Sequence, residues 1–172
     1  MPYIRHIQNE HHYSEVVERM KTAKKSLRIG TADIKDLYVS ENGIVVPLMK
    51  VWSDLIKKGV DVQLIHAKEP GKNFKDDFDK YPILWSKLNR MLCPRVHFKI
   101  VIIDDQIAYS GSANLTGAGI GMKSKNRRNF ESGFLTNHPQ IVKSLITQFQ
   151  NVWNKSHCRT CERKTFCQDC GI

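Results

Sequence analysis

The middle of the chain contains a run of β-forming residues, VHFKIVIID at positions 96–104, and this run constrains the fold more than any other feature. Branched and aromatic side chains favour an extended backbone, and a nearly continuous apolar run favours a strand buried on both faces. Because side chains alternate between the faces of a strand, His97 and Lys99 are expected to share one face, and Asp104 ends the run on the other. Polar groups in such a strand indicate a candidate functional site.

Strand-like and helix-like patterns alternate along the rest of the chain. The strand-like segments are 26–34, 60–67, 106–111 and 129–136, and the helix-like segments are 13–25, 41–59, 72–92 and 138–153. Gly59 is a plausible end for its helix, and the strand that follows at once favours parallel pairing with the strand before the helix. Pro82 interrupts or splits its helix, and Asn137 is the candidate N-cap of the last helix.

This order predicts an α/β fold in which a mixed β-sheet is sandwiched between helices. We expect residues 1–154 to form this domain and residues 155–172 to form a small C-terminal metal-binding tail rich in cysteine. No window approaches the roughly 18 apolar residues of a membrane span, and the N-terminus lacks the apolar core of a signal peptide. A soluble, cytoplasmic protein is therefore expected.

The charge balance of the chain is strongly basic. Its net charge is +10 at pH 7, while its hydrophobic content of 41% is ordinary for a globular protein. Such a surface favours polyanions such as nucleic acid, anionic membranes or phosphorylated substrates. The alternative is a basic protein that binds no polyanion.

Three short motifs follow one another along the chain. They are HxKxxxxD at His97, Lys99 and Asp104, GSxN at Gly111, Ser112 and Asn114, and Asn-x-Glu at Asn129 and Glu131. A turn of small residues after a strand exposes amide and hydroxyl donors, which suit a phosphate or an oxyanion. In this order the motifs resemble the phospholipase D superfamily, and the resemblance extends over about residues 26–153.

The resemblance implies a phosphodiesterase that needs no metal for catalysis. One histidine attacks phosphorus to form a covalent phosphohistidine, and a second protonates the leaving oxygen and then activates water. By this resemblance Lys99, Ser112 and Asn114 hold the non-bridging oxygens. Glu131 orients His97, and Asp104 has a structural role.

Chemistry of this kind needs two histidines, and the chain has one complete motif. The pair His66 and Lys68 lacks the aspartate five residues later and is better explained as a strand end. Surface or capping positions are expected for the other histidines, which are His6, His11, His12, His138 and His157. A single motif in a short chain resembles the bacterial nucleases of the superfamily that act as homodimers. The resemblance thus implies a C2 dimer with both His97 residues in one cleft.

The loop between the second and third motifs carries four cations, Lys123, Lys125, Arg127 and Arg128. Beside a phosphodiester site such cations favour binding along a nucleic-acid backbone, and a solvated loop is the alternative. Single-stranded substrates need stacking aromatic side chains. The available ones are Tyr81, Trp85 and Phe130, for each of which core packing is the expected use.

A nuclease acting on DNA or RNA is the function that these features favour. A phospholipase-type lipid phosphodiesterase and a non-catalytic nucleic-acid-binding module are the alternatives. The sequence points to no particular protein partner, such as a helicase or a methyltransferase.

Four cysteines near the C-terminus have the spacing C-x2-C-x5-C-x2-C, at Cys158, Cys161, Cys167 and Cys170. Two such pairs suit tetrahedral zinc, which would fold and anchor the tail. An iron–sulfur cluster is the alternative, with Cys170 or the distant Cys93 as fourth ligand. Disulfides or free thiols are the remaining possibility.

Overall fold

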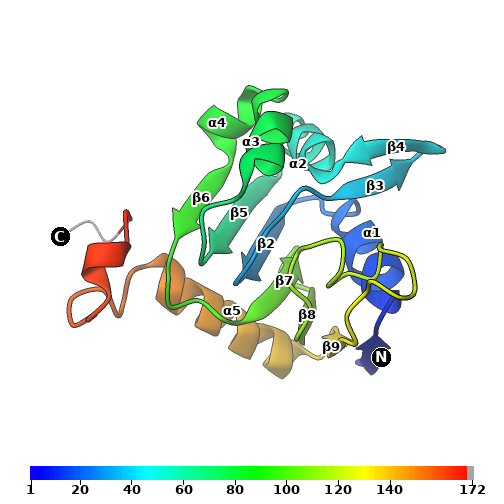
Figure 1. The fold of residues 1–172 in the computed structure, drawn as a ribbon. Coiled ribbons are helices and arrows are strands. Elements are labelled where there is room, and N and C mark those ends of the chain that lie inside the picture. The colour runs from blue at the N-terminus through cyan, green and yellow to red at the C-terminus, as the bar shows by residue number, and fades with distance from the viewer. Residues whose placement is uncertain (170–172) are drawn as a thin grey trace.

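A seven-stranded mixed sheet forms the centre of the structure, a computed structural model that describes residues 1–169 (Figure 1). The order is β1-β9-β8-β7-β2-β5-β6, with β2, β5 and β6 parallel to one another and the other pairs antiparallel. The strands are β1 (Ile4–Gln8), β2 (Ser26–Thr31), β5 (Asp61–His66), β6 (Asn89–Leu92), β7 (Lys99–Ile103), β8 (Ile107–Gly111) and β9 (Ser132–Thr136). A separate hairpin consists of β3 (Tyr38–Glu41) and β4 (Ile44–Pro47).

Helices cover both faces of this sheet. They are the π-helix η1 (His12–Val17), α1 (Glu18–Met20), α2 (Leu48–Lys57), α3 (Lys72–Asp79), α4 (Ile83–Lys87), α5 (Pro139–Trp153) and the short 3-10 helix η2 (Lys164–Phe166). One hydrophobic cluster packs the helices from η1 to α4 on one face, and a second packs α5 on the other. The predicted mixed sheet between helices is therefore confirmed.

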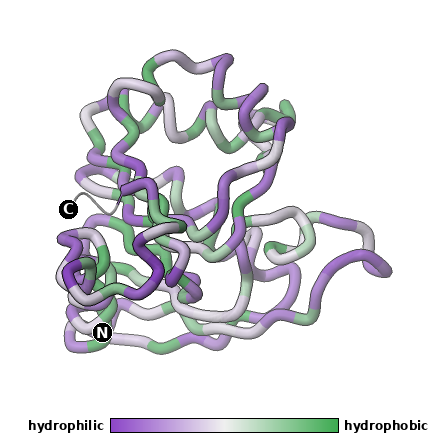
Figure 2. The backbone as a smooth tube through the Cα atoms, turned by 60° about the vertical axis from the view of Figure 1, so that its left-hand side comes forward, coloured by the Kyte–Doolittle hydropathy of each residue, from purple (hydrophilic) through white to green (hydrophobic). Residues whose placement is uncertain are grey.

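Strand β7 contributes to both clusters, as its apolar run predicts. Ile100 and Ile102 belong to the cluster under α5, whereas Val101 and Ile103 belong to the opposite cluster. Hydrophobic and hydrophilic residues alternate along much of the chain (Figure 2), which is the pattern expected when each element buries one side.

The helix predicted at 41–59 begins later than expected. Residues 44–47 form strand β4, and α2 starts only at Leu48. Asn42 and Gly43 have φ of 51° and 80° and form the turn between β3 and β4. An Asn-Gly pair is a strong hairpin signal, which outweighs the helical pattern. Gly59, with φ 86°, follows the end of α2 as expected.

Other boundaries also differ from the sequence-based prediction. Helix α1 ends at Met20 rather than at residue 25, and strands β1 and β6 were not predicted. Pro82 does separate α3 from α4. Asn137 is not the N-cap of α5, because its Oδ1 accepts a hydrogen bond from the Tyr3 backbone at 2.7 Å and His138 precedes the helix instead. Within residues 1–169, no helix is long and apolar enough to cross a membrane.

Asp104 joins the β7–β8 hairpin to the start of β2. Asp104 and Asp105 have φ of 54° and 57°, which define a type I′ turn. The Asp104 carboxylate accepts hydrogen bonds from the backbone of Lys24, Lys25 and Ser26 at 2.7–3.0 Å. Burial raises the pKa of Asp104, but these three hydrogen bonds outweigh it and hold the pKa below its ordinary value. The structural role expected for Asp104 agrees with this geometry.

Replacing Asp104 should destabilise the fold in a pH-dependent way. Asp104→Ala leaves three backbone amides without their acceptor and places alanine at positive φ, so we expect a loss of about 2–3 kcal/mol at neutral pH. Asp104→Asn tolerates positive φ and keeps one acceptor oxygen, so it should lose less. Because the folded pKa is lowered, the carboxylate stabilises the fold above its unfolded pKa, and this advantage disappears as pH falls through the folded pKa. Urea unfolding across pH measures both effects, and equal stability of wild type and Asp104→Ala would contradict them.

Candidate active site

The three motifs meet at one end of the sheet, where β2 and β8 end and β7 and β9 begin. Lys99 begins β7 directly opposite Gly111, the last residue of β8. Gly111 in turn lies opposite Gly133 of β9. A Cβ on Gly111 would overlap the Tyr109 hydroxyl and the Ser132 carbonyl oxygen, so glycine permits this close approach. The carboxyl ends of parallel strands, found here, are the usual place for ligands in α/β sheets.

His97 and Lys99 are in contact, but the predicted alternation of side chains along a strand is not the reason, because only Lys99 belongs to the strand. His97 is exposed and precedes β7, which begins only at Lys99. Lys99, with 7% of its surface exposed, donates from Nζ to the His97 carbonyl oxygen at 2.7 Å. Its Nζ also lies 3.3 Å from Nδ1 of the His97 ring. The exposed imidazole and the nearly buried amine thus form a pair at the sheet end.

The residue between them holds this segment against the sheet. The Phe98 ring packs so closely over Gly30 of β2 that a Cβ at position 30 would overlap it. The absence of a side chain at Gly30 therefore leaves room for the Phe98 ring against β2, and this contact holds the backbone between His97 and Lys99 close to the sheet.

Ser112 and Glu131 are bonded to each other. The Ser112 hydroxyl donates to one Glu131 oxygen, and Asn129 Nδ2 donates to the other at 2.9 Å. The Ser132 backbone amide donates to the Ser112 hydroxyl at 3.0 Å, which fixes the hydroxyl from the other side. Within the described chain Glu131 binds these two side chains and not His97, whose orientation it was expected to control.

Asn114 is held by the end of β2. Its Oδ1 accepts hydrogen bonds from the Asp33 backbone amide at 3.1 Å and from the Thr31 hydroxyl at 3.4 Å. The Leu115 amide donates to the same Thr31 hydroxyl at 3.1 Å. Thr31 is a supporting residue that sequence analysis missed, because no local pattern links positions so distant along the chain. Among residues 1–169, the Asn114 amide nitrogen has no acceptor and is available to a ligand.

A small cavity under the site is lined by Lys99, His12 and Tyr109. Burial lowers the pKa of Lys99, while the Glu131 charge acts in the opposite direction. Burial also lowers the pKa of His12 and raises that of Tyr109. The expectation that His12 lies at the surface is wrong: its Nδ1 is 2.8 Å from the Asn9 carbonyl, and its ring meets the Tyr109 ring edge-on.

The second HxK pair is not exposed to a substrate. His66 is fully buried at the end of β5, beside Thr31 of β2, and its Nδ1 lies 2.7 Å from the Lys68 carbonyl. Burial lowers the pKa of His66, which favours the neutral ring. The prediction that this histidine marks a strand end is confirmed.

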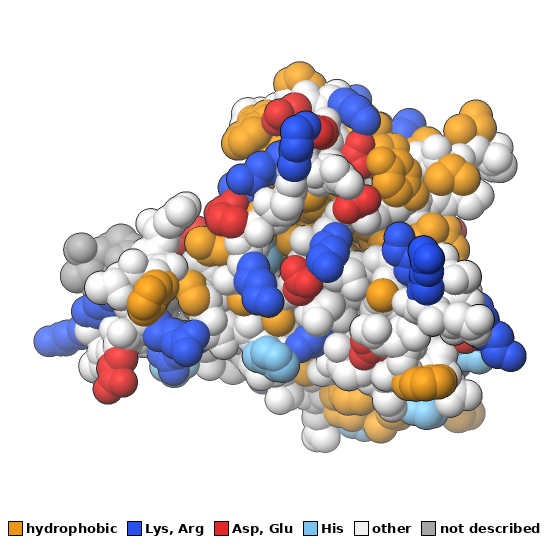
Figure 3. Space-filling view, viewed as in Figure 1, with side chains coloured by type: hydrophobic (Ala, Val, Ile, Leu, Met, Phe, Trp, Pro, Cys, Tyr) orange, Lys and Arg blue, Asp and Glu red, His pale blue; other side chains and the backbone are white. Residues whose placement is uncertain are grey.

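The basic loop divides into two parts. Lys123, Lys125 and Arg127 are exposed, whereas Arg128 is half-buried and pairs with Glu10 at 2.9 Å. Lys and Arg side chains are also spread over the face seen in Figure 3. The expected core packing of two aromatic residues is wrong, because Phe130 is 98% and Trp85 is 64% exposed. Phe130 lies between Asn129 and Glu131 of the third motif, so an exposed aromatic ring flanks the site.

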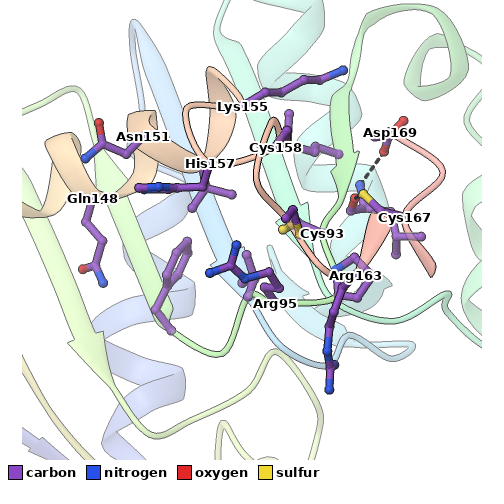
Figure 4. A pocket seen from close by; sticks show the side chains of 17 residues that line it. Cys93, Arg95, Gln148, Asn151, Lys155, His157, Cys158, Arg163, Cys167 and Asp169 are labelled. Carbon is purple, nitrogen blue, oxygen red and sulfur yellow. Dashed lines mark hydrogen bonds between the residues drawn. The ribbon is translucent and has the colours of Figure 1, made fainter. Parts of the chain in front are cut away.

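Three of the C-terminal cysteines are among the residues that line a cavity of about 280 Å³ next to β6 (Figure 4). Its lining includes Cys158, Cys161 and Cys167 together with Cys93, which lies far away in the sequence. Cys170, the fourth predicted ligand, lies outside the described residues. Among residues 1–169, no three His, Cys, Asp or Glu side chains are already arranged as a metal-binding group. The donor types suit a soft metal, but the described side chains are not preassembled around one.

Comparison with known proteins gives a family and a fold. The profile of the family described as "Cardiolipin synthase, PLD-like domain" matches residues 16–153. No curated protein sequence matches the chain. Nuc from Salmonella typhimurium, a phospholipase D family member, is 20% identical with a TM-score of 0.67, over 90% of this chain and 95% of its own. NucT from Helicobacter pylori is 16% identical with a TM-score of 0.63, over 88% and 97%.

A phosphatidylserine synthase from Haemophilus influenzae Rd KW20 is also similar in structure. It is 16% identical with a TM-score of 0.62, over 88% of this chain but 38% of its own. At such identities these likenesses show the fold. The family match covers most of the chain, so the protein belongs to the phospholipase D superfamily, as a PLD-like domain. This membership supports a phosphodiesterase-type enzyme, and the family predicted from the motifs is confirmed.

Removing the Glu131 charge should lower the pKa of Lys99 further. The negative carboxylate of Glu131 favours the protonated amine of Lys99. In Glu131→Gln this effect is lost, and the burial that lowers the Lys99 pKa is no longer opposed by it. NMR titration of the lysine side chains measures this shift. Glu10→Gln is the matched control, because Glu10 pairs with Arg128 and should leave Lys99 unchanged. A Lys99 pKa that stays constant or rises in Glu131→Gln would contradict the expected coupling.

Proposed function

We propose that the protein is a nuclease that hydrolyses DNA or RNA through a covalent phosphohistidine on His97, with no metal in the catalytic steps. The contact between the exposed His97 ring and Lys99 carries this proposal. The Asn114 amide lies at the same end of the sheet, where it suits a non-bridging oxygen of a phosphodiester, whereas the Ser112 hydroxyl already donates to Glu131.

In the proposed first step, His97 Nε2 attacks phosphorus, because Nδ1 already faces Lys99. The new N–P bond forms as the bond to the leaving oxygen breaks, and that oxygen takes a proton from a second histidine. In the second step, this histidine removes a proton from water, which attacks phosphorus and releases His97. Lys99 and the Asn114 amide bind the non-bridging oxygens throughout.

A second copy of the chain is proposed to supply the second histidine. His66 is buried and bonded to its own loop, so it is unsuited to proton transfer with a substrate. His97 is exposed, as a C2 arrangement with two such residues in one cleft requires. The chain also covers nearly the whole length of Nuc and NucT, whereas it covers 38% of the phosphatidylserine synthase.

Nucleic acid is the proposed substrate because cations and an aromatic ring flank the site. Lys123, Lys125 and Arg127 are exposed and free to contact phosphates, although Arg128 is occupied by Glu10. Phe130, next to Glu131, offers a face on which an unpaired base can stack. Lipid is the second candidate, supported by the structural likeness to a phosphatidylserine synthase.

Cleavage assays in excess EDTA test the proposed reaction. Wild-type protein should cleave single-stranded DNA, double-stranded DNA or RNA, whereas His97→Asn should lose at least about a thousandfold in rate. His138→Asn, at the start of α5, is the matched control and should keep its activity. Circular dichroism of the same samples checks that chelation leaves the fold intact. Activity that needs added Mg²⁺, that survives in His97→Asn or that acts only on lipid would refute the nuclease.

Mixing experiments test whether two chains share one site. Wild-type and His97→Asn chains are mixed in equal amounts and allowed to exchange subunits. If each site needs both His97 residues, only wild-type pairs are active, and activity should fall to about one quarter of that of undiluted wild type. A fall to about one half means that each chain acts alone. Light scattering that finds only monomers at working concentration would also contradict the shared site.

A further inference from the structure

A turn at residues 9–12, directly after β1, holds the backbone of Glu131. The Asn9 backbone amide donates to the Glu131 carbonyl oxygen at 3.0 Å, and the Glu131 backbone amide donates to the Asn9 side-chain oxygen at 3.1 Å. Asn9 has a φ of 49°, a conformation that asparagine adopts more readily than most residues do. One residue near the N-terminus thus satisfies both backbone groups of Glu131.

His12 closes this turn from the buried side. Its backbone amide and its ring Nδ1 lie 3.1 and 2.8 Å from the Asn9 carbonyl oxygen. Because a carbonyl oxygen can only accept, Nδ1 carries the ring proton, and Nε2 of the neutral ring is an acceptor. Nε2 is buried and has no hydrogen-bond partner among residues 1–169, so a second ring proton would be a buried donor without an acceptor. Burial lowers the pKa of His12, although the Asn9 hydrogen bond and the Glu131 charge act in the opposite direction. The neutral ring is therefore the form that fits this place.

The basic loop packs on the same turn. Gly121 has a φ of 81°, and a Cβ at this position would overlap the backbone of Glu10, so glycine permits the close approach. Arg128, near the end of the loop, pairs with the Glu10 carboxylate at 2.9 Å. Figure 1 shows this loop, drawn in yellow, against the blue N-terminal segment. The turn therefore connects the N-terminal segment to the loop as well as to Glu131.

Glu131 acts on two other groups of the site. Its carboxylate accepts a hydrogen bond from the Ser112 hydroxyl. Burial lowers the pKa of Lys99, and the charge of Glu131 opposes this effect. Because the interaction of two charges weakens with distance, the effect on Lys99 depends on where the carboxylate lies. Side chains of Ser112 and Asn129 hold its two oxygens, and Asn9 holds its backbone.

We propose that Asn9 and His12 are positioning residues, which hold Glu131 where it acts on Lys99 and Ser112. Asn9 does so through the backbone of Glu131, and His12 does so through the Asn9 carbonyl oxygen. Both residues precede residue 16, where the family match begins, so the N-terminal segment adds this support to the matched domain. The effect on the charge of Lys99 does not depend on the proposed nuclease function, whereas the effect on cleavage rests on it.

A double-mutant cycle in the full-length protein tests whether Asn9 acts through Glu131. Asn9→Gly tolerates the positive φ but removes the side-chain acceptor, so it should lower the pKa of Lys99, as measured by NMR titration. In a Glu131→Gln background the same change should have no further effect on this pKa. Asn42→Gly, at the positive φ of the β3–β4 turn, is the matched control and should leave Lys99 unchanged in both backgrounds. A constant Lys99 pKa in Asn9→Gly, or an equal fall in both backgrounds, would overturn the proposal.

Cleavage assays on the same variants separate this role from the nuclease function. Asn9→Gly should cleave about tenfold more slowly than wild type, with no further loss in the Glu131→Gln background. Asn42→Gly should cleave at the wild-type rate. If wild type cleaves no nucleic acid but Asn9→Gly still lowers the Lys99 pKa, the positioning role stands and the nuclease fails. A wild-type rate in Asn9→Gly, in an active enzyme, would overturn the role in catalysis.

NMR of the wild-type protein tests the His12 contact without a substitution. Ring-nitrogen shifts at neutral pH should show a proton on Nδ1 and none on Nε2, and the ring should titrate below the ordinary histidine pKa. His12→Phe keeps a ring against Tyr109 but has no donor for Asn9, so the Glu131 amide should exchange with solvent about tenfold faster than in wild type. A proton on Nε2, or unchanged exchange of this amide in His12→Phe, would exclude His12 from the positioning role.

Discussion

Strand β7 is hydrogen-bonded on both edges, to β2 on one side and to β8 on the other, and all five of its residues are buried. A shift of one residue would turn each of its side chains to the opposite face. The two hydrophobic clusters prevent this, because each takes alternate residues of the strand. The register then places Lys99 opposite Gly111, next to Ser112 of the second motif. The geometry of the whole site depends on this buried strand.

The polar groups around Lys99 are held mainly by the backbone. Asn114 accepts from the Asp33 amide, Ser112 accepts from the Ser132 amide, and Lys99 donates to the His97 carbonyl. Side chains anchored in this way need little reorganisation when a ligand binds. Burial disfavours the charge on Lys99, so an anionic phosphate would add to the support that Glu131 already gives it. The His97 ring lies exposed, as the proposed completion of the site by a second chain requires.

Sequence patterns located the central elements because their signals are local. The apolar run of β7, the break at Pro82 and the stop at Gly59 each depend on neighbouring residues, and each agrees with the structure. Asn42 and Gly43 are also a local signal, for a hairpin turn, but the helical pattern of the residues after them favoured a helix over the whole segment. Asparagine is a common N-cap residue, yet the Asn137 side chain accepts a hydrogen bond from the backbone amide of Tyr3, near the N-terminus. Contacts of that kind leave no trace in a local pattern.

By itself, the amino-acid sequence determined the family, the α/β order and the identity of the motif residues, since these follow from residue types at short spacings. Only the tertiary structure decided which groups meet. It buried His12 and His66, left Phe130 exposed, and brought Cys93 to the C-terminal tail. Such outcomes depend on strand order and register, which pair residues that are far apart in the chain. Burial and neighbouring groups then determine the protonation and the mobility of each side chain. Residue type alone specifies neither of these properties.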